Sequence, residues 1–295
     1  MKTFNTLLLR EWFQYRWGWL AIILIPVVVL LALVPFSQVE GIQTLAPEPI
    51  ALISAGLTMG LVMALVLAAT VYQLMGLPRR DQQDRSIEFW KSLPGSDTQS
   101  LAAPLLAHAV LLPLSALAIA MAGGSVVGVA MTIKELGLDG LRQMQWAGVG
   151  HAAIWLLVRL MAGLVLAMLW LSPFLLALMA ASAWLKRWGA PLLMFGVGGL
   201  IKLYDGRLPM EVLIRQVDGA RRSLISGAPG LASFPPGTSA APMDDLYDAL
   251  YRFPDWAPRD LGMALQSTLS PQFVGGLAVA AVCFALLVWQ RRRAV

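Results

Sequence analysis

Charged residues are scarce in this chain. Only 13% of its 295 residues are Asp, Glu, Lys or Arg, whereas 58% are hydrophobic, and the mean hydropathy is +0.69. Soluble proteins of this length rarely combine such values. The composition therefore predicts a polytopic membrane protein in contact with lipid. The net charge of +5 does not indicate nucleic-acid binding, because the basic residues lie mostly at the ends of apolar runs.

The sequence also lacks the common motifs for catalysis and metal binding. It contains no GxxxxGK[ST] segment to hold nucleotide phosphates, no HExxH and no CxxC. The single cysteine, Cys283, cannot form a disulfide within the chain. For His108 we favour a hydrogen-bonded structural role over a proton relay, and for His151 an interfacial position on the outer side. We therefore expect a protein that is not an enzyme and has no catalytic residues, no metal and no cofactor of its own.

Six apolar runs are long enough, or nearly so, to cross a bilayer as helices of about 20 residues. The sequence predicts an all-α membrane protein with one domain, 1–295, and six spans at about 18–35, 50–75, 101–133, 147–184, 188–203 and 273–289. Pro113 and Pro173 predict bends in the long third and fourth runs. Gly123, Gly124 and Gly128 predict close contacts between helices.

Three stretches outside the spans also carry a pattern. Residues 4–17 predict an interfacial helix before the first span, with the irregular start of that span as the alternative. Residues 134–142 are expected to form a loop. Residues 204–270 predict an outer segment of interfacial or re-entrant helices. Their clearest signals are an apolar stripe at Met210, Leu213, Ile214 and Val217 and a second short helix at 246–250.

Basic residues concentrate on one side of the predicted spans. Both termini and the polar stretch 79–97 share this side, whereas the first loop on the other side has no Lys or Arg. The positive-inside rule then places both termini in the cytoplasm, with 204–270 outside. Arg159 is the one charge within an apolar run. We expect it to snorkel or to pair with an outer carboxylate, and otherwise to bind an anionic substrate or act in an outer gate.

The polar stretch between the second and third spans contains a short amphipathic helix. Ile87, Trp90 and Leu93 recur at three-residue spacing, which forms one apolar face over about two turns. Asp84 is the predicted N-cap, and Pro94 followed by glycine ends the helix. Ser96 is then the predicted N-cap of the next helix, with Gln99 completing a capping box. Such a helix can rest on lipid or dock on a soluble partner.

The segment DRSIEFWKSLPGSD, residues 84–97, resembles the cytoplasmic loop of bacterial type-2 ABC exporter permeases, one branch of which carries a DR…FW(K/R)SLP.SD pattern. The wider layout is also similar, with an N-terminal amphipathic helix and six spans. The resemblance implies a permease subunit of a bacterial cytoplasmic (inner) membrane that pairs as a dimer, either homo- or heterodimeric. It also implies a separate cytoplasmic ATPase that binds ATP and Mg and drives export. The implied coupling helix contacts this ATPase through Asp84, Arg85, Ile87, Glu88, Phe89, Trp90, Lys91, Ser92, Leu93 and Pro94.

Two other functions remain open from the sequence. A non-transporting membrane scaffold or sensor of the same fold would relay ATPase movement to an outer partner instead of moving a substrate. An intramembrane enzyme using Arg159 or His151 is the least favoured reading, because no catalytic motif accompanies either residue. The expected partners are the ATPase, a second permease copy and membrane lipid, without nucleic acid. The residues do not identify a substrate.

Overall fold

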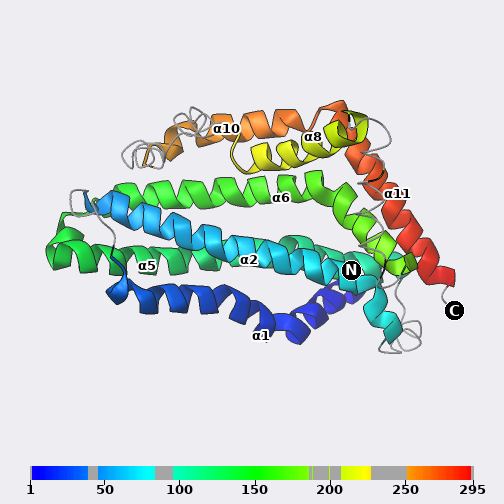
Figure 1. Cartoon of the computed structure of the whole chain (residues 1–295), viewed down its shortest axis with the longest axis horizontal. Coiled ribbons are helices and arrows are strands. Elements are labelled where there is room, and N and C mark those ends of the chain that lie inside the picture. Colours follow the sequence, from blue (N-terminus) through cyan, green and yellow to red (C-terminus); the bar gives the residue numbers. More distant parts are fainter. Residues whose placement is uncertain are drawn as a thin grey trace.

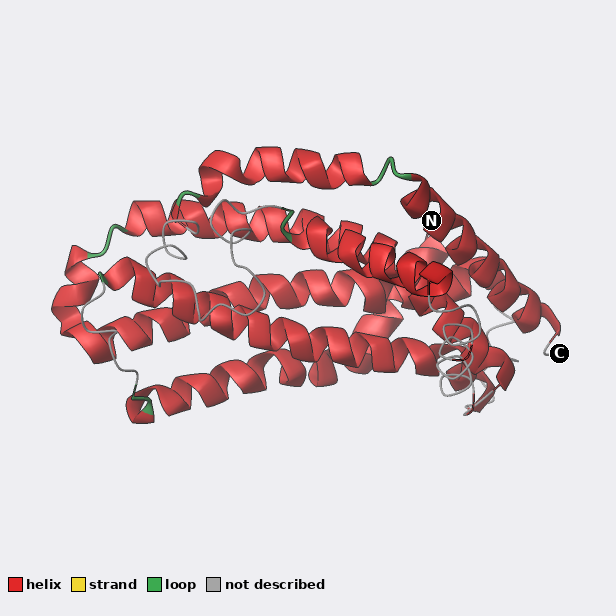
Figure 2. Ribbon diagram, turned by 45° about the horizontal axis from the view of Figure 1, so that its top comes forward, coloured by secondary structure: helices red, strands yellow, loops and turns green. Residues whose placement is uncertain are grey.

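The computed structural model describes residues 2–38, 46–83, 96–185, 207–226 and 251–293, together with Trp188 and Gly199. Within these ranges every regular element is a helix, as the ribbon in Figure 2 shows. This confirms the predicted all-α class.

The helices follow one another as α1 (Lys2–Leu33), η1 (Val34–Phe36), α2 (Pro47–Gln83), α4 (Asp97–Leu106), η3 (Ala107–Leu111), α5 (Leu112–Gln143), α6 (Trp146–Leu185), α8 (Arg207–Leu224), α10 (Phe253–Ser267) and α11 (Pro271–Arg293). In the described part, five segments are long and apolar enough to cross a membrane: Phe4–Phe36, Pro47–Pro78, Asp97–Gln143, Trp146–Leu185 and Pro271–Arg293. They match five of the six predicted spans. The remaining one, 188–203, lies outside the described residues except for Trp188 and Gly199.

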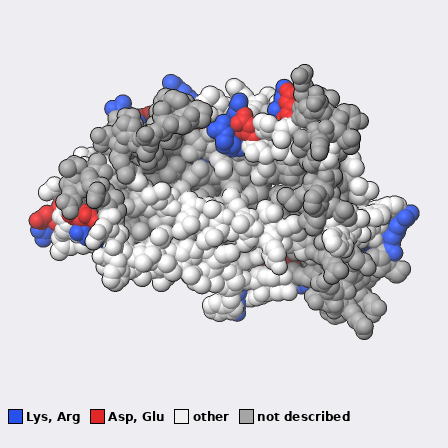
Figure 3. Space-filling view, viewed as in Figure 1, with Lys and Arg blue, Asp and Glu red and all other residues white. Residues whose placement is uncertain are grey.

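Four long helices, α1, α2, α5 and α6, run lengthwise and form most of the molecule (Figure 1). Helices α8 and α10 lie against α6, and α11 packs on both α6 and α8. The two chain termini lie towards the same end, where α2 ends and α4 begins; we call this the termini end. In Figure 3, charged side chains of the described residues gather at the ends and over α8 and α10, and few lie between.

The closest helix packing joins α2 to α5. An added Cβ on Gly124 would lie 2.6 Å from the carbonyl oxygen of Ala55, and one on Gly128 would collide with the carbonyl oxygen of Ala51. The two glycines and the two alanines are each four residues apart, so one turn of each helix repeats the contact. This confirms the close approach predicted from the glycines, and it is the small-residue packing expected between membrane helices.

Both predicted proline sites coincide with irregular helix geometry. Pro113 follows a turn of π-helix, η3, which separates α4 from α5. Because proline has no N–H to donate to the carbonyl four residues earlier, the wider turn accommodates the missing bond. Pro173 lies inside α6, which changes direction in its C-terminal part in Figure 1.

Two predicted boundaries differ in the structure. Helix α1 is continuous through Trp17 and Gly18, so residues 4–17 and the first span form one long helix, and an interfacial position for residues 4–17 stays a prediction. The loop predicted at 134–142 is wrong, because α5 continues to Gln143. The helix is broken within this range only at Gly137, where a φ of 69° suits a residue without Cβ. Leu136 packs against the buried cluster that includes Met131, and a pattern of charged residues does not reveal such packing.

The helix start predicted at Ser96 is confirmed. The Ser96 hydroxyl accepts the backbone N–H of Gln99 at 3.2 Å, as the capping pattern predicts. The Ser270 hydroxyl accepts the N–H of Phe273 at 3.4 Å, directly before α11.

The apolar stripe beginning at Met210 lies on α8. On the same helix the guanidinium of Arg221 donates to Asp218 and holds the pKa of that carboxyl below its usual value. Residues 246–250 lie outside the described residues, and α10 was not distinguished from the sequence.

The α2–α5 contact predicts a difference between two glycine-to-alanine variants in the spans. Gly128→Ala should destabilise the protein by about 1–3 kcal/mol, because the new methyl group overlaps the Ala51 backbone. Gly60→Ala, whose Cβ meets nothing within 4 Å, should leave stability unchanged or raise it slightly. Thermal unfolding of both variants in the same detergent is the measurement. Equal midpoints for the two would show that the helices separate easily at this point.

Candidate functional site

Arg159 is the one Asp, Glu, Lys or Arg residue of the described α6, and it is buried, with 2% of its surface exposed. Its Nε and Nη2 both donate to Oδ2 of Asp260 in α10, at 2.9 and 2.6 Å. Its Nη1 donates to the carbonyl oxygen of Ser223, at 2.8 Å. The guanidinium thus joins α6, α8 and α10 at a single point.

Each partner of Arg159 is itself well placed. The Ser223 carbonyl belongs to the last turn of α8, where carbonyls lack intrahelical donors and a cation is favourable. The Asp260 carboxylate also accepts the backbone N–H of Ser226 at 3.0 Å, so both of its oxygens are used. Gly163, one turn beyond Arg159, leaves the space for this arrangement, since a Cβ there would lie 2.7 Å from Nη1. A buried ion pair needs this degree of satisfaction to offset its desolvation.

The structure shows the pairing with a carboxylate that the sequence suggested for Arg159, whereas a role in substrate binding or in an outer gate stays a prediction. The Arg159 side chain pairs with a carboxylate from the segment predicted to be outer, and that carboxylate is 1% exposed. An anionic substrate could reach the guanidinium only after α10 moves away. We call Arg159, Asp260, Ser223 and Ser226 the arginine junction.

The predicted coupling residues Asp84, Arg85, Ile87, Glu88, Phe89, Trp90, Lys91, Ser92, Leu93 and Pro94 lie outside the described residues. The helices next to them, however, are described, and polar contacts connect these helices at the termini end. The Ser182 hydroxyl in α6 donates to the Met75 carbonyl of α2 at 2.6 Å, and the Gln290 amide in α11 donates to the Ala183 carbonyl of α6 at 2.9 Å. The carboxylate of Asp97, at the start of α4, lies 4.0 Å from Arg291 Nε.

A second buried pair lies between α1 and the π-helical turn. Nε2 of His108 is 3.3 Å from Oε2 of Glu11, and both side chains are 1% exposed. The rings of Tyr15 and Trp19 each lie edge-on to the imidazole, with centroids 5.2 Å away. The structure thus confirms a hydrogen-bonded His108. His151 is exposed and accepts the indole N–H of Trp155 at 3.0 Å.

Sequence reasoning found Arg159 but missed its partners. Asp260 was one carboxylate among several in a segment read as loop and short helices, and a backbone carbonyl such as that of Ser223 leaves no sequence signal. Glu11 was read as part of an interfacial face, yet its position in a helix followed by a long apolar run could have marked it as buried. Within the described residues, no group of three or more His, Cys, Asp or Glu side chains is arranged to hold a metal ion.

Comparison of the chain with protein-family models, with curated proteins and with solved structures finds no match. The arrangement of the described helices is therefore the basis for any functional inference, together with the sequence motif.

The arginine junction predicts that α10 loosens when one of its charges is removed. We expect Asp260→Asn to destabilise the packing of α10 by about 3–5 kcal/mol, because it leaves Arg159 buried without a counter-charge. In a Cys283→Ser background, maleimide labelling of Ala264→Cys, a position that is 1% exposed, should become markedly faster in the Asp260→Asn variant.

Two controls accompany this measurement. Arg221→Met removes an exposed ion pair on α8 and should leave the labelling rate unchanged. Combining Asp260→Met with Arg159→Met should slow the labelling again, since an apolar pair replaces the unpaired charge. Unchanged labelling in Asp260→Asn would show that the junction does not hold α10 in place.

Proposed function

We propose that this chain is the membrane-spanning permease subunit of an ATP-driven ABC exporter. A separate cytoplasmic ATPase docks on the helix at 84–94, and its movement passes into the spans through the termini end. The full protein is a permease dimer with six spans per chain and both termini in the cytoplasm. The observation that carries the proposal is the segment DRSIEFWKSLPGSD between two membrane-crossing helices.

The composition of this segment supports docking to a protein rather than to lipid alone. Glu88 lies between Arg85 and Lys91, whereas a helix that binds anionic lipid is usually basic on its whole polar face. Trp90 and Phe89 add large apolar side chains of the kind enriched at protein interfaces.

The contacts at the termini end support transmission of movement. The segment 84–95 is preceded by α2 and followed by α4, so a displaced segment pulls on both. Helix α2 is hydrogen-bonded through Met75 to α6, and α6 is hydrogen-bonded through Ala183 to α11. Force applied between α2 and α4 would therefore act on a connected set of helices instead of on one isolated span.

The experiment combines Glu88→Lys with Trp90→Ala in the full chain, co-expressed with its ATP-binding partner. Loss of a central tryptophan and reversal of a charge should weaken ATPase binding by at least about tenfold, with a matching loss of permease-stimulated ATP hydrolysis. Thermal stability of the spans should not change. Co-purification and ATPase assays in reconstituted membranes give the readouts.

Trp155→Ala serves as the matched control, because Trp155 is a partly exposed tryptophan in α6, far along the chain from the segment. It should leave ATPase binding unaffected. Full binding and full stimulation in the Glu88→Lys, Trp90→Ala variant would refute docking at this helix. So would labelling of a cysteine introduced at position 90 by an impermeant reagent added to intact cells.

The scaffold or sensor function differs from export in one measurable respect. An exporter concentrates a substrate in inside-out vesicles when ATP is supplied, whereas a scaffold hydrolyses ATP through its partner without accumulation. The arginine junction gives the scaffold reading a specific basis, because it fixes two amphipathic helices, α8 and α10, to a span.

A further inference from the structure

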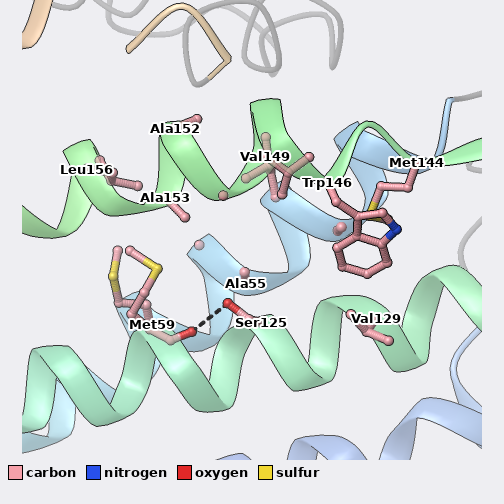
Figure 4. A pocket seen from close by; sticks show the side chains of 15 residues that line it. Ala55, Met59, Ser125, Val129, Met144, Trp146, Val149, Ala152, Ala153 and Leu156 are labelled. Atoms are coloured by element: carbon pink, nitrogen blue, oxygen red, sulfur yellow. Dashed lines mark hydrogen bonds between the residues drawn. The ribbon is translucent and has the colours of Figure 1, made fainter. Parts of the chain in front are cut away.

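A cavity of about 190 Å³ lies between α2, α5 and α6, separate from the arginine junction and from the termini end (Figure 4). Its walls are made of small residues, among them Ala55 and Gly56 of α2 and Ala153 of α6. Methionines, including Met59, also line it. For comparison, an engineered apolar cavity of about 150 Å³ stays dry and binds benzene or xenon.

The donor groups of the polar side chains that line the cavity already donate hydrogen bonds to backbone carbonyls of the protein. The Ser125 hydroxyl donates to the backbone carbonyl of Met121 at 2.9 Å, shown as the dashed line in Figure 4. The indole N–H of Trp146 donates to the Leu141 carbonyl at 3.1 Å. A polar ligand would lose its own hydration here without gaining partners, so the site favours a hydrocarbon.

The cavity is partly open to the exterior of the helices, since two of its lining residues, Ser125 and Trp146, are themselves exposed. Each of the three helices also presents a large, exposed apolar side chain next to a lining residue. These neighbours are Leu57 of α2, 71% exposed, Val126 of α5, 54% exposed, and Ile154 of α6, 64% exposed. In helices that are long and apolar enough to cross a membrane, such side chains face hydrocarbon. Lipid chains therefore have direct access to the cavity.

The cavity also extends along the helices. Its lining runs from Ala51 to Met59 on α2 and from Met121 to Val129 on α5, eight residue steps on each. At 1.5 Å per residue this is about 12 Å, so the space is longer than it is wide. Trp146 lies at one end and Met59 at the other (Figure 4). An elongated apolar space of this kind matches part of a hydrocarbon chain.

We propose that this cavity binds the end of one acyl chain of a membrane phospholipid, which enters at the Trp146 end and places its terminal methyl near Met59. The flexible thioethers of the methionines adapt to a chain with variable kinks. The inference does not rest on ATP-driven export, because it concerns the described helices alone. Its test requires no ATPase.

The experiment uses the full chain in nanodiscs that contain phosphatidylethanolamine with a diazirine near the end of one acyl chain. After illumination, mass spectrometry maps the adducts. We expect adducts on Met59, Met121 and Leu156 to exceed those on the surface residues Leu57 and Val126. Ala153→Phe should reduce the cavity adducts about tenfold or more, because each displaced methylene group lowers affinity about fourfold.

Ile154→Phe is the matched control, since it places the same side chain on the adjacent, exposed position of α6 and should leave the cavity adducts unchanged. Gly56→Leu fills the cavity from α2, where an added Cβ meets nothing within 4 Å, and it should repeat the loss if Ala153→Phe fails to fold. The proposal would be wrong if cavity and surface residues carried equal numbers of adducts, or if the cavity adducts persisted in both filling variants. Either result would show that lipid contacts the cavity no more specifically than it contacts the outer surface. Disulfide crosslinking between two copies through Ala153→Cys would show instead that a second chain covers it, and would overturn the proposal.

Discussion

A guanidinium cannot remain buried among membrane-crossing helices unless its charge and its donors are satisfied where it lies. Arg159 meets that requirement with a carboxylate from α10 and a carbonyl from the end of α8. Both amphipathic helices also bury side chains, among them Ala220 of α8 and Phe253 and Ala257 of α10, while Val212, Ile214 and Leu265 remain exposed. The ion pair adds to this burial a fixed point at which α8, α10 and α6 meet.

The long helices are held together by other interactions. At Gly124 and Gly128, association of α2 with α5 depends on backbones that approach closely, without a side chain between them. At the termini end, hydrogen bonds to carbonyls, such as that from Ser182 to Met75, accompany an apolar cluster that includes Leu74 and Leu287. The structure thus has one region of close backbone contact, one apolar region with a few polar contacts and one charged junction.

The sequence predicted the features that arise from local chemistry. Ser96 caps a helix because its own side chain reaches the next turn, and Gly124 permits contact because it lacks a side chain. Features that depend on distant pairing were not accessible. Nothing local distinguishes Asp260 from other acidic residues near it, and the extension of α5 past Ile133 depends on packing that charge patterns do not report. The coupling helix remains a prediction from its motif.

The α2–α5 contact has a mechanical consequence. With glycine facing a backbone carbonyl at two successive turns, no side chain at these turns is available to rotate or yield between the two helices. They cannot slide along each other there without a steric collision, so this part of the pair moves as one rigid unit. The π-helical turn η3 and Pro113 lie between this unit and α4, so a displacement of α4 can be absorbed there before it reaches the rigid part. Further adjustment would fall to α1 and α6, which pack against the pair.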